Sequence, residues 1–204
     1  PAGAEFDYQQ ADILDEDALN GVVAEFQPNW VFHLAALSFA VRDEVLDFYS
    51  VHVIGTENLL RAVQTGAPDC EALVLSSSAN VYGIPPDATP ITESGTWPKP
   101  IHHYAYAKLS MEHMAMTYAD QMPILIARPF NYTGVGQKSV FFVPKIVGYF
   151  REKAPVLELG NLDTVRDFTD VRDIARYYIL LAEQGVRGEI YNFCNGSGRT
   201  MHEV

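Results

Sequence analysis

Short apolar stretches alternate with longer amphipathic stretches along almost the whole chain. The short stretches are rich in Val, Ile, Leu and Phe, a pattern typical of buried strands, and we expect them at residues 6–10, 30–33, 72–75, 124–127 and 189–193. The longer stretches predict helices at residues 15–26, 44–65, 103–118, 143–152 and 170–184. A further extended piece is expected at 156–159, and the residues from 199 onward read as the beginning of another helix.

Strands that are apolar on both sides and alternate with helices predict a parallel sheet covered by helices on both faces. In such sheets, ligands bind beyond the carboxyl ends of the strands. Small or polar residues follow four of the expected strands: Asp12, the segment 33–36, the segment 76–78 and the segment 128–131. The sequence therefore predicts one cleft at this edge of the sheet.

Composition narrows the class of partner. The chain has 204 residues and a net charge of −12, which disfavours a nucleic-acid surface, since a basic patch is the usual footprint of one. The longest apolar run, residues 31–37, is too short to span a membrane, so no membrane partner is expected. Cys70 and Cys194 lie far apart in no metal or redox spacing, and we interpret both as free thiols in a cytoplasmic protein.

Tyr104 and Lys108 are the most informative pair. Four residues apart on a helix, the phenol and the ammonium share one face. A nearby cation favours the phenolate, so Tyr104 could exchange a proton with a bound substrate. The spacing alone is weak evidence and gains weight only from the segments around it.

Taken in order, those segments resemble the extended short-chain dehydrogenases/reductases of the nucleotide-sugar epimerase/dehydratase family. The matching motifs are Asp12-Ile13, His33-Leu-Ala-Ala36, Gly55-Thr56, Ser76 to Gly83, Tyr104 to Lys108, Arg128-Pro-Phe-Asn131, Gly160-Asn-Leu162 and Arg166-Asp-Phe-Thr-Asp170. The resemblance implies an α/β fold: a Rossmann-like, doubly wound parallel sheet with a small C-terminal substrate lobe. Residues 1–130 would form part of the dinucleotide-binding domain, to which 170–192 returns, and residues 131–169 and 193–204 would form parts of the lobe.

The resemblance also implies roles for individual residues. Ser78, Tyr104 and Lys108 would be catalytic: Ser78 hydrogen-bonds the reacting sugar oxygen, Tyr104 exchanges its proton, and Lys108 lowers the pKa of Tyr104 and holds the nicotinamide ribose. NAD or NADP is the implied cofactor. The residues implied to contact it are Asp12, Ile13, Leu34, Ala35, Ala36, Ser76, Tyr104, Lys108 and Pro129.

For the substrate, a nucleoside-diphosphate sugar, the resemblance implies contacts from Asn131, Val143 and Arg166. An arginine presents a planar fork suited to phosphate oxygens. The alternative for Arg166 is a salt bridge to Asp163, Asp167 or Asp170. For Asp12 the alternative is a solvated turn carboxylate. A homodimer through the helices at 44–65 and 103–118 is expected by analogy.

Two departures from the family pattern qualify the resemblance. The family usually carries Asn where this chain has His52, and the glycine-rich phosphate-binding turn would precede residue 1, so we expect a fragment lacking the first βαβ unit. His102, His103 and His113 lie in no metal-ligand spacing, and no metal site is expected.

The choice of reaction depends on Asn80. Dehydratases of the family carry a carboxylate two residues before the tyrosine that is Tyr82 here, and an amide cannot take a proton at neutral pH. The sequence therefore favours NAD(P)-dependent oxidoreduction at the sugar C4, by a 4-ketoreductase or a 4-epimerase. A 4,6-dehydratase and a non-catalytic nucleotide-binding member stay open as alternatives. The branch that this chain resembles is that of GDP-mannose 4,6-dehydratase and GDP-6-deoxy-4-ketohexose reductase.

Overall fold

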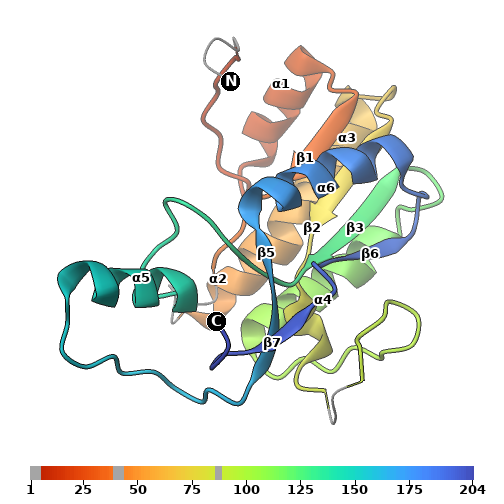
Figure 1. The fold of residues 1–204 in the computed structure, drawn as a ribbon. Coiled ribbons are helices and arrows are strands. Elements are labelled where there is room, and N and C mark those ends of the chain that lie inside the picture. The colour runs from red at the N-terminus through yellow and green to blue at the C-terminus, as the bar shows by residue number, and fades with distance from the viewer. Residues whose placement is uncertain (1–5, 39–43, 86–88) are drawn as a thin grey trace.

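The computed structural model describes residues 6–38, 44–85 and 89–204. A parallel four-stranded sheet in the order β1-β2-β3-β6 forms its centre (Figure 1). The strands are β1 (Trp30–His33), β2 (Ala72–Ser76), β3 (Ile124–Pro129) and β6 (Ile190–Phe193). All four lie where the apolar stretches predict them. The central strands β2 and β3 are almost entirely buried, whereas β1 and β6 at the edges are partly buried.

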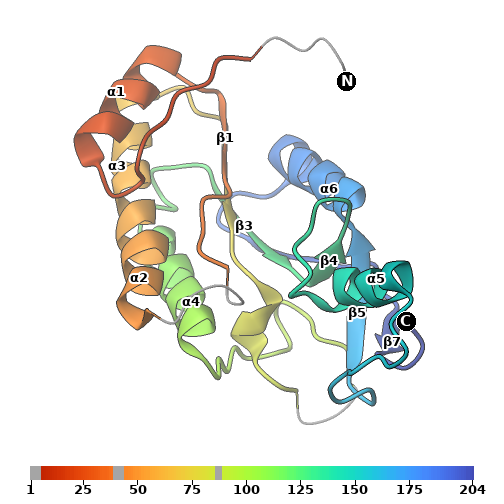
Figure 2. The same ribbon diagram turned by 90° about the vertical axis from the view of Figure 1, so that its left-hand side faces the viewer.

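Helices cover both faces of this sheet, as the alternating pattern predicts (Figure 2). Helices α1 (Glu16–Phe26), α3 (Gly55–Gly66) and α4 (His103–Met116) lie on one face, where Leu73, Leu75 and Ile126 enter a shared core. Helix α6 (Val171–Gln184) covers the other face, where it packs on Val74 and Leu125. Among the helices that the structure describes, none is long and apolar enough to cross a membrane.

The helix expected at 44–65 is interrupted by a π-helical turn. It runs as α2 (Val45–Tyr49), the π-helical segment η1 (Ser50–Ile54) and then α3. Single π turns inside α-helices are frequent at functional sites, and this one carries His52.

A second, smaller sheet stands beside the carboxyl end of the first. It contains β4 (Asn131–Thr133), β5 (Val165–Asp170) and β7 (Gly198–Thr200), in the order β4-β5-β7. Helix α5 (Phe142–Glu152) projects from this part of the molecule (Figure 1). The strands of this small sheet fall within residues 131–169 and 193–204, which the resemblance places in the substrate lobe, except that β5 extends to Asp170. The role of this sheet in binding stays a prediction.

Two expected elements are wrong. Residues 6–10 form no strand, and the end of the chain forms β7 and a turn instead of a helix. Residues 156–159, expected to be extended, belong to no helix or strand. Phe6 and Tyr8 are 83% and 77% exposed, and residues 6–10 pair with no strand of the described chain. A strand needs a partner for its backbone groups, and an apolar pattern alone does not reveal whether one is present.

Candidate active site

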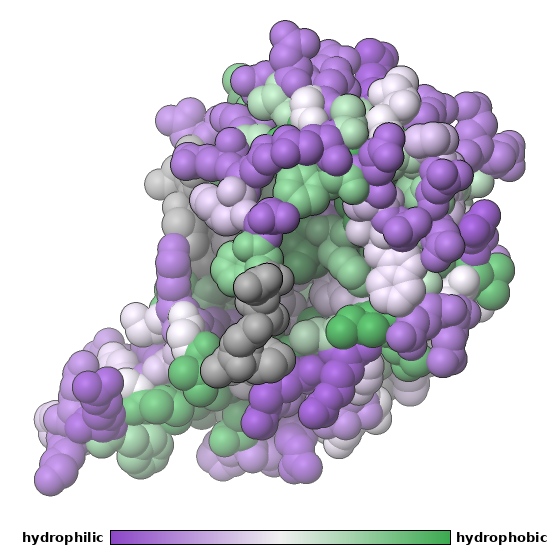
Figure 3. Space-filling view, turned by 90° about the horizontal axis from the view of Figure 1, so that it is seen from above, coloured by the Kyte–Doolittle hydropathy of each residue, from purple (hydrophilic) through white to green (hydrophobic). Residues whose placement is uncertain are grey.

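Polar groups gather beyond the carboxyl ends of β1, β2 and β3, at the edge of the sheet that the sequence predicts. Residues 34–36 follow β1 and are exposed, whereas His33, Ser77 and Ser78 at the ends of β1 and β2 are buried. Seen from above, the molecule is hollowed, with mostly hydrophobic walls and a hydrophilic surround (Figure 3).

Ser78 caps the 3₁₀ helix η2 (Ala79–Tyr82), which turns the chain away from β2. Its Oγ accepts hydrogen bonds from the Asn80 backbone N–H at 3.2 Å and from Asn80 Nδ2 at 3.1 Å. These two bonds leave the Ser78 hydroxyl proton available for donation. The turn closes at Gly83, where φ is +71° and a Cβ would meet the Lys99 carbonyl oxygen at 2.0 Å, so only glycine fits.

Tyr104 lies in the first turn of α4, which His102 caps by accepting from the Ala105 N–H at 3.2 Å. Its ring packs edge-on against Phe48 and His52, with centroid distances of 5.9 and 5.4 Å. Burial raises the pKa of Tyr104 to about 12, and a hydrogen bond with Ser78 opposes the shift. The lowering of this pKa that the resemblance implies for Lys108 is not found in the chain alone, where burial is the largest effect and Lys108 is not among the groups that shift it.

Lys108 lies one turn further along α4 and is 2% exposed. Its ammonium donates to the Ser76 carbonyl at the end of β2, with Nζ 2.6 Å from the oxygen. Burial lowers the pKa of Lys108 to about 8, while the Glu112 carboxylate acts in the opposite direction. At neutral pH the site therefore presents a neutral phenol near a lysine that is still mostly charged.

His52 occupies the position where the resemblance leads one to expect Asn. The Thr56 hydroxyl donates its one proton to the His52 carbonyl, with an Oγ1–O distance of 2.6 Å. Thr56 Oγ1 must therefore accept the hydrogen bond from His33 Nε2, which lies 2.8 Å away. His52 Nε2 accepts from the Leu37 N–H at 3.0 Å, which places the ring proton on Nδ1, and this atom has no partner among the described residues. Burial lowers the pKa of His33 to about 4 and that of His52 to about 3, so both rings are neutral.

The residues predicted to contact the cofactor come from the segment before α1, from the ends of β1, β2 and β3, and from α4. The Ile13 carbonyl accepts from Asn58 Nδ2 of α3 at 3.2 Å, and the Ile13 side chain lies where a Cβ on Gly55 would fall, 2.7 Å away. Asp12 is exposed, with Oδ1 accepting from the Leu14 N–H at 2.9 Å, which leaves its second oxygen to solvent or a ligand. Leu34, Ala35 and Ala36 are exposed, Ser76 Oγ bonds Tyr178, and Pro129 is buried at the end of β3.

The residues predicted to bind substrate lie around the small sheet. Asn131 on β4 is paired with Phe168 on β5, two residues beyond Arg166 on the same strand. Val143 is in the first turn of α5, whose Phe142 stacks on Phe168 at 6.4 Å. The three residues therefore lie on connected elements.

Arg166 does not form the ion pair considered as its alternative. Its Nη1 donates to the Val165 carbonyl at 2.8 Å. Asp167 accepts instead from the Asn195 and Ser197 N–H groups, and Asp170 pairs with Arg172. Burial lowers the pKa of Arg166, whose guanidinium forms no ion pair within the part of the chain that the structure describes.

The described residues contain no group of three or more His, Cys, Asp or Glu side chains placed to hold a metal. His102 caps α4, and His103 Nδ1 lies 3.2 Å from the Tyr49 hydroxyl.

Sequence reasoning missed a buried polar network behind these residues. Arg128 was recognised only as part of a motif, and Glu112, Ser77, Tyr82 and Asn192 were given no role. One signal was available: Glu112 follows Lys108 by four residues, on a helix face that is otherwise buried and mostly apolar.

Comparison with known proteins identifies the family. The model of the NAD-dependent epimerase/dehydratase family matches residues 2–194. The chain belongs to this family. It is 36% identical to GDP-6-deoxy-D-talose 4-dehydrogenase of Aggregatibacter actinomycetemcomitans, over 95% of this chain and 65% of that protein. It is 33% identical to GDP-6-deoxy-D-mannose reductase of Pseudomonas aeruginosa, over 95% of this chain and 66% of that protein.

A solved structure agrees. RMD from Pseudomonas aeruginosa, complexed with NADPH, superposes with a TM-score of 0.85 at 30% identity, covering 96% of this chain and 67% of that one. The predicted Rossmann-like fold class and family are thus confirmed. The chain spans about two thirds of the length of these curated epimerase/dehydratase relatives.

Proposed function

We propose that the chain carries the catalytic and substrate-binding part of an NAD(P)-dependent enzyme that oxidises or reduces C4 of a nucleoside-diphosphate sugar. The reaction would be that of a 4-ketoreductase or a 4-epimerase. The observation that carries the proposal is the convergence of Ser78, Tyr104 and Lys108 at one sheet edge, with Tyr104 hydrogen-bonded to Ser78 and Lys108 tied to the end of β2. The two GDP-sugar relatives described above support the substrate class.

Ser78, Tyr104 and Lys108 would each have a different role at the reacting sugar oxygen. Ser78, oriented by its two bonds from Asn80, donates its hydroxyl proton to that oxygen. Tyr104 gives its proton to the oxygen during reduction and takes one during oxidation. Its pKa of about 12 keeps it protonated in the chain alone, which suits a proton donor. The Lys108 ammonium stabilises the negative charge that the tyrosine oxygen then carries.

The residues present fit a nicotinamide dinucleotide. Ala35 and Ala36 expose backbone with small side chains beside β1, and Lys108 is the buried cation near the reacting oxygen. Asp12, Ile13, Leu34, Ser76 and Pro129 would line the rest of the site. When bound, NAD or NADP would supply or accept the hydride.

Asn80 favours oxidoreduction over dehydration. Removing a carbon-bound proton during elimination requires a base. At the position expected for that base the side chain is an amide that already donates to Ser78. Oxidation or reduction at C4 requires only Ser78, Tyr104 and Lys108.

The substrate would be held by the small sheet. Arg166, without a carboxylate partner among the described residues, would bind the diphosphate, Asn131 would bind beside it, and Val143 would lie near the nucleotide base. We further propose a cytoplasmic homodimer through α2, α3 and α4. Leu46 on α2, Ile54 at the end of η1 and Tyr106 on α4 are 77%, 54% and 49% exposed, which suits an apolar contact.

The test uses the intact protein, meaning residues 1–204 together with whatever sequence flanks them. It is mixed with a GDP-linked 4-keto-6-deoxy sugar and NADPH or NADH, and absorbance at the reduced-nicotinamide band is followed. Stoichiometric loss of the band indicates a reductase. In a second reaction, the protein is mixed with a GDP-sugar that carries a C4 hydroxyl and with NAD, and interconversion of its C4 epimers without net change in the band indicates an epimerase. Formation of a 4-keto-6-deoxy product from GDP-mannose would contradict the assignment.

A further inference from the structure

A fully buried ion pair lies behind the proposed proton-exchange site. Arg128 of β3 and Glu112 of α4 have side chains that are 3% and 1% exposed. Arg128 Nη2 donates to Glu112 Oε2 at 2.5 Å, and Arg128 Nε donates to Glu112 Oε1 at 2.9 Å. The two bonds form a planar fork that fixes the direction as well as the distance between helix and strand.

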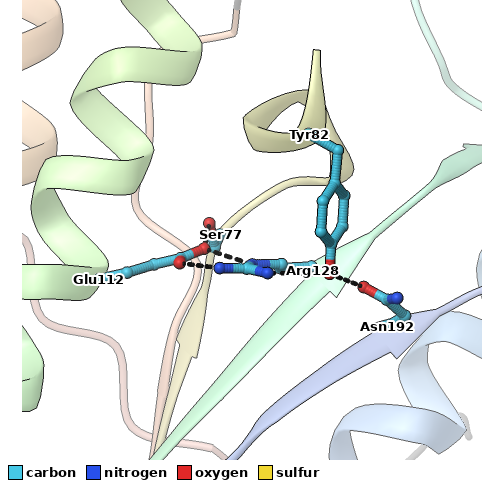
Figure 4. Close-up of polar contacts among 5 residues, drawn as sticks. All are labelled: Ser77, Tyr82, Glu112, Arg128 and Asn192. Atoms are coloured by element: carbon cyan, nitrogen blue, oxygen red, sulfur yellow. Dashed lines mark hydrogen bonds and ion pairs between the residues drawn. The ribbon is translucent and has the colours of Figure 1, made fainter. Parts of the chain in front are cut away.

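The pair is the centre of a network that joins five elements. Ser77, at the end of β2, donates to Glu112 Oε1. On the other side, Arg128 Nη1 donates to the Tyr82 hydroxyl of η2 at 2.8 Å, and that hydroxyl donates to Asn192 Oδ1 of β6 at 2.9 Å. Figure 4 shows Glu112 meeting the guanidinium from one side and Tyr82 standing between Arg128 and Asn192.

Fold stability is a poor explanation for this pair. Removing two charges from water costs several kcal/mol per ion, and apolar residues of similar volume often replace a buried ion pair without loss of stability. Apolar contacts have no preferred direction, whereas a charged fork with both bonds in place favours one register between α4 and the ends of the strands.

Three members of the network, Glu112, Ser77 and Tyr82, lie near the proposed catalytic side chains in the sequence. Glu112 is one turn beyond Lys108 on α4, and Ser77 directly precedes Ser78. Tyr82 is the last residue of η2, the helix that Ser78 caps. The network therefore joins the helix that carries Tyr104 and Lys108 to the turn that carries Ser78.

We propose that Glu112 and Arg128 are positioning residues that hold α4 in register with the end of β2, so that Ser78, Tyr104 and Lys108 meet at one substrate oxygen. The proposal rests on the function proposed above. A displacement of about 1 Å at a catalytic group can cost about a hundredfold in rate, so loss of the fork should affect turnover more than substrate binding.

The test is a double variant, Glu112→Leu with Arg128→Met, in the intact protein. It removes both charges and keeps apolar bulk, so the melting temperature should stay within a few degrees of wild type. We expect turnover to fall by about a hundredfold at a nearly unchanged KM for the nucleotide sugar. The control applies the same replacements to an exposed pair on α6, Asp173→Leu with Arg176→Met, whose side chains are 44% and 76% exposed. The control should keep full turnover.

Retention of turnover within threefold by the Glu112/Arg128 double variant would overturn the proposal. If that variant does not fold, the Ser77→Ala variant tests the proposal instead. It removes the hydrogen bond from Ser77 to Glu112 and leaves the Glu112–Arg128 ion pair in place. A tenfold loss of turnover at unchanged KM supports positioning, and a wild-type rate refutes it.

A structural readout separates this proposal from the proposed function. If the wild-type protein converts no nucleotide sugar, the proposed function fails. Crystal structures of the wild type and of the folded double variant, or of Ser77→Ala, then show whether α4 keeps its position relative to the end of β2. The 2.6 Å contact between Lys108 Nζ and the Ser76 carbonyl is the measure. Displacement of Lys108 or Tyr104 by about 1 Å supports positioning, and unchanged positions refute it.

Discussion

Acidification should destabilise this protein well above the pH at which its carboxylates titrate, because two neutral histidines are buried in its core. His33 and His52 are 5% and 0% exposed, and burial lowers their pKa values from 6.5 to about 4 and about 3. Their folded-state pKa values lie below the unfolded value. The stability they provide is therefore present above pH 6.5 and is lost as pH falls from 6.5 toward those folded values.

The magnitude follows from proton linkage. Between pH 7.0 and 5.5 each unfolded histidine takes up most of a proton that its folded counterpart, with a pKa of about 4 or 3, does not bind. This difference lowers the free energy of unfolding by about 1.2 kcal/mol per histidine, or about 2.5 kcal/mol for both. Asp and Glu stay charged through most of this interval, and Lys108, with a folded pKa of about 8, stays mostly protonated.

Urea unfolding at pH 7.0 and 5.5 measures the effect, and the midpoint should fall by about 1 M. His52→Asn should lose about half of the pH dependence, while keeping an acceptor for the Leu37 N–H. His113→Asn is the control, since that side chain is exposed on α4. His102 contributes equally to the pH dependence of the free energy of unfolding in both variants, so its contribution cancels in the comparison. Equal pH dependence in the two variants would refute the reasoning.

Three further predictions concern the intact protein. Tyr104→Phe should reduce turnover by about 10²–10⁴-fold with cofactor affinity near wild type by fluorescence titration, and a variant at full rate would contradict the proton-exchange role. Arg166→Ala should weaken binding of the nucleotide sugar by about 1.5–3 kcal/mol in calorimetry, because a charged hydrogen bond is lost, and unchanged affinity would place the diphosphate elsewhere. Asn80→Ala removes one of two bonds to Ser78 Oγ and should lower turnover more than it raises KM, whereas a pure KM effect would argue against orientation of Ser78.

The sequence by itself determined the sheet, most of the helices and the three side chains proposed to be catalytic. The strands Ala72–Ser76 and Ile124–Pro129 are buried along nearly their whole length, so their near-continuous apolar composition identifies them. Side chains four residues apart on a helix must share a face, so Tyr104 and Lys108 could be paired without coordinates.

Only the tertiary structure decided what depends on segments distant in sequence. The segment at residues 6–10 has a strand pattern but no partner strand among the described residues. The pKa of Tyr104 rises where a neighbouring lysine led us to expect a fall, because the extent of burial is set by Phe48 and His52 from another helix. The bonds from Glu112 to Arg128 and Ser77 join residues 16 and 35 positions apart. No local pattern specifies such contacts, because packing of the helix on the sheet is what creates them.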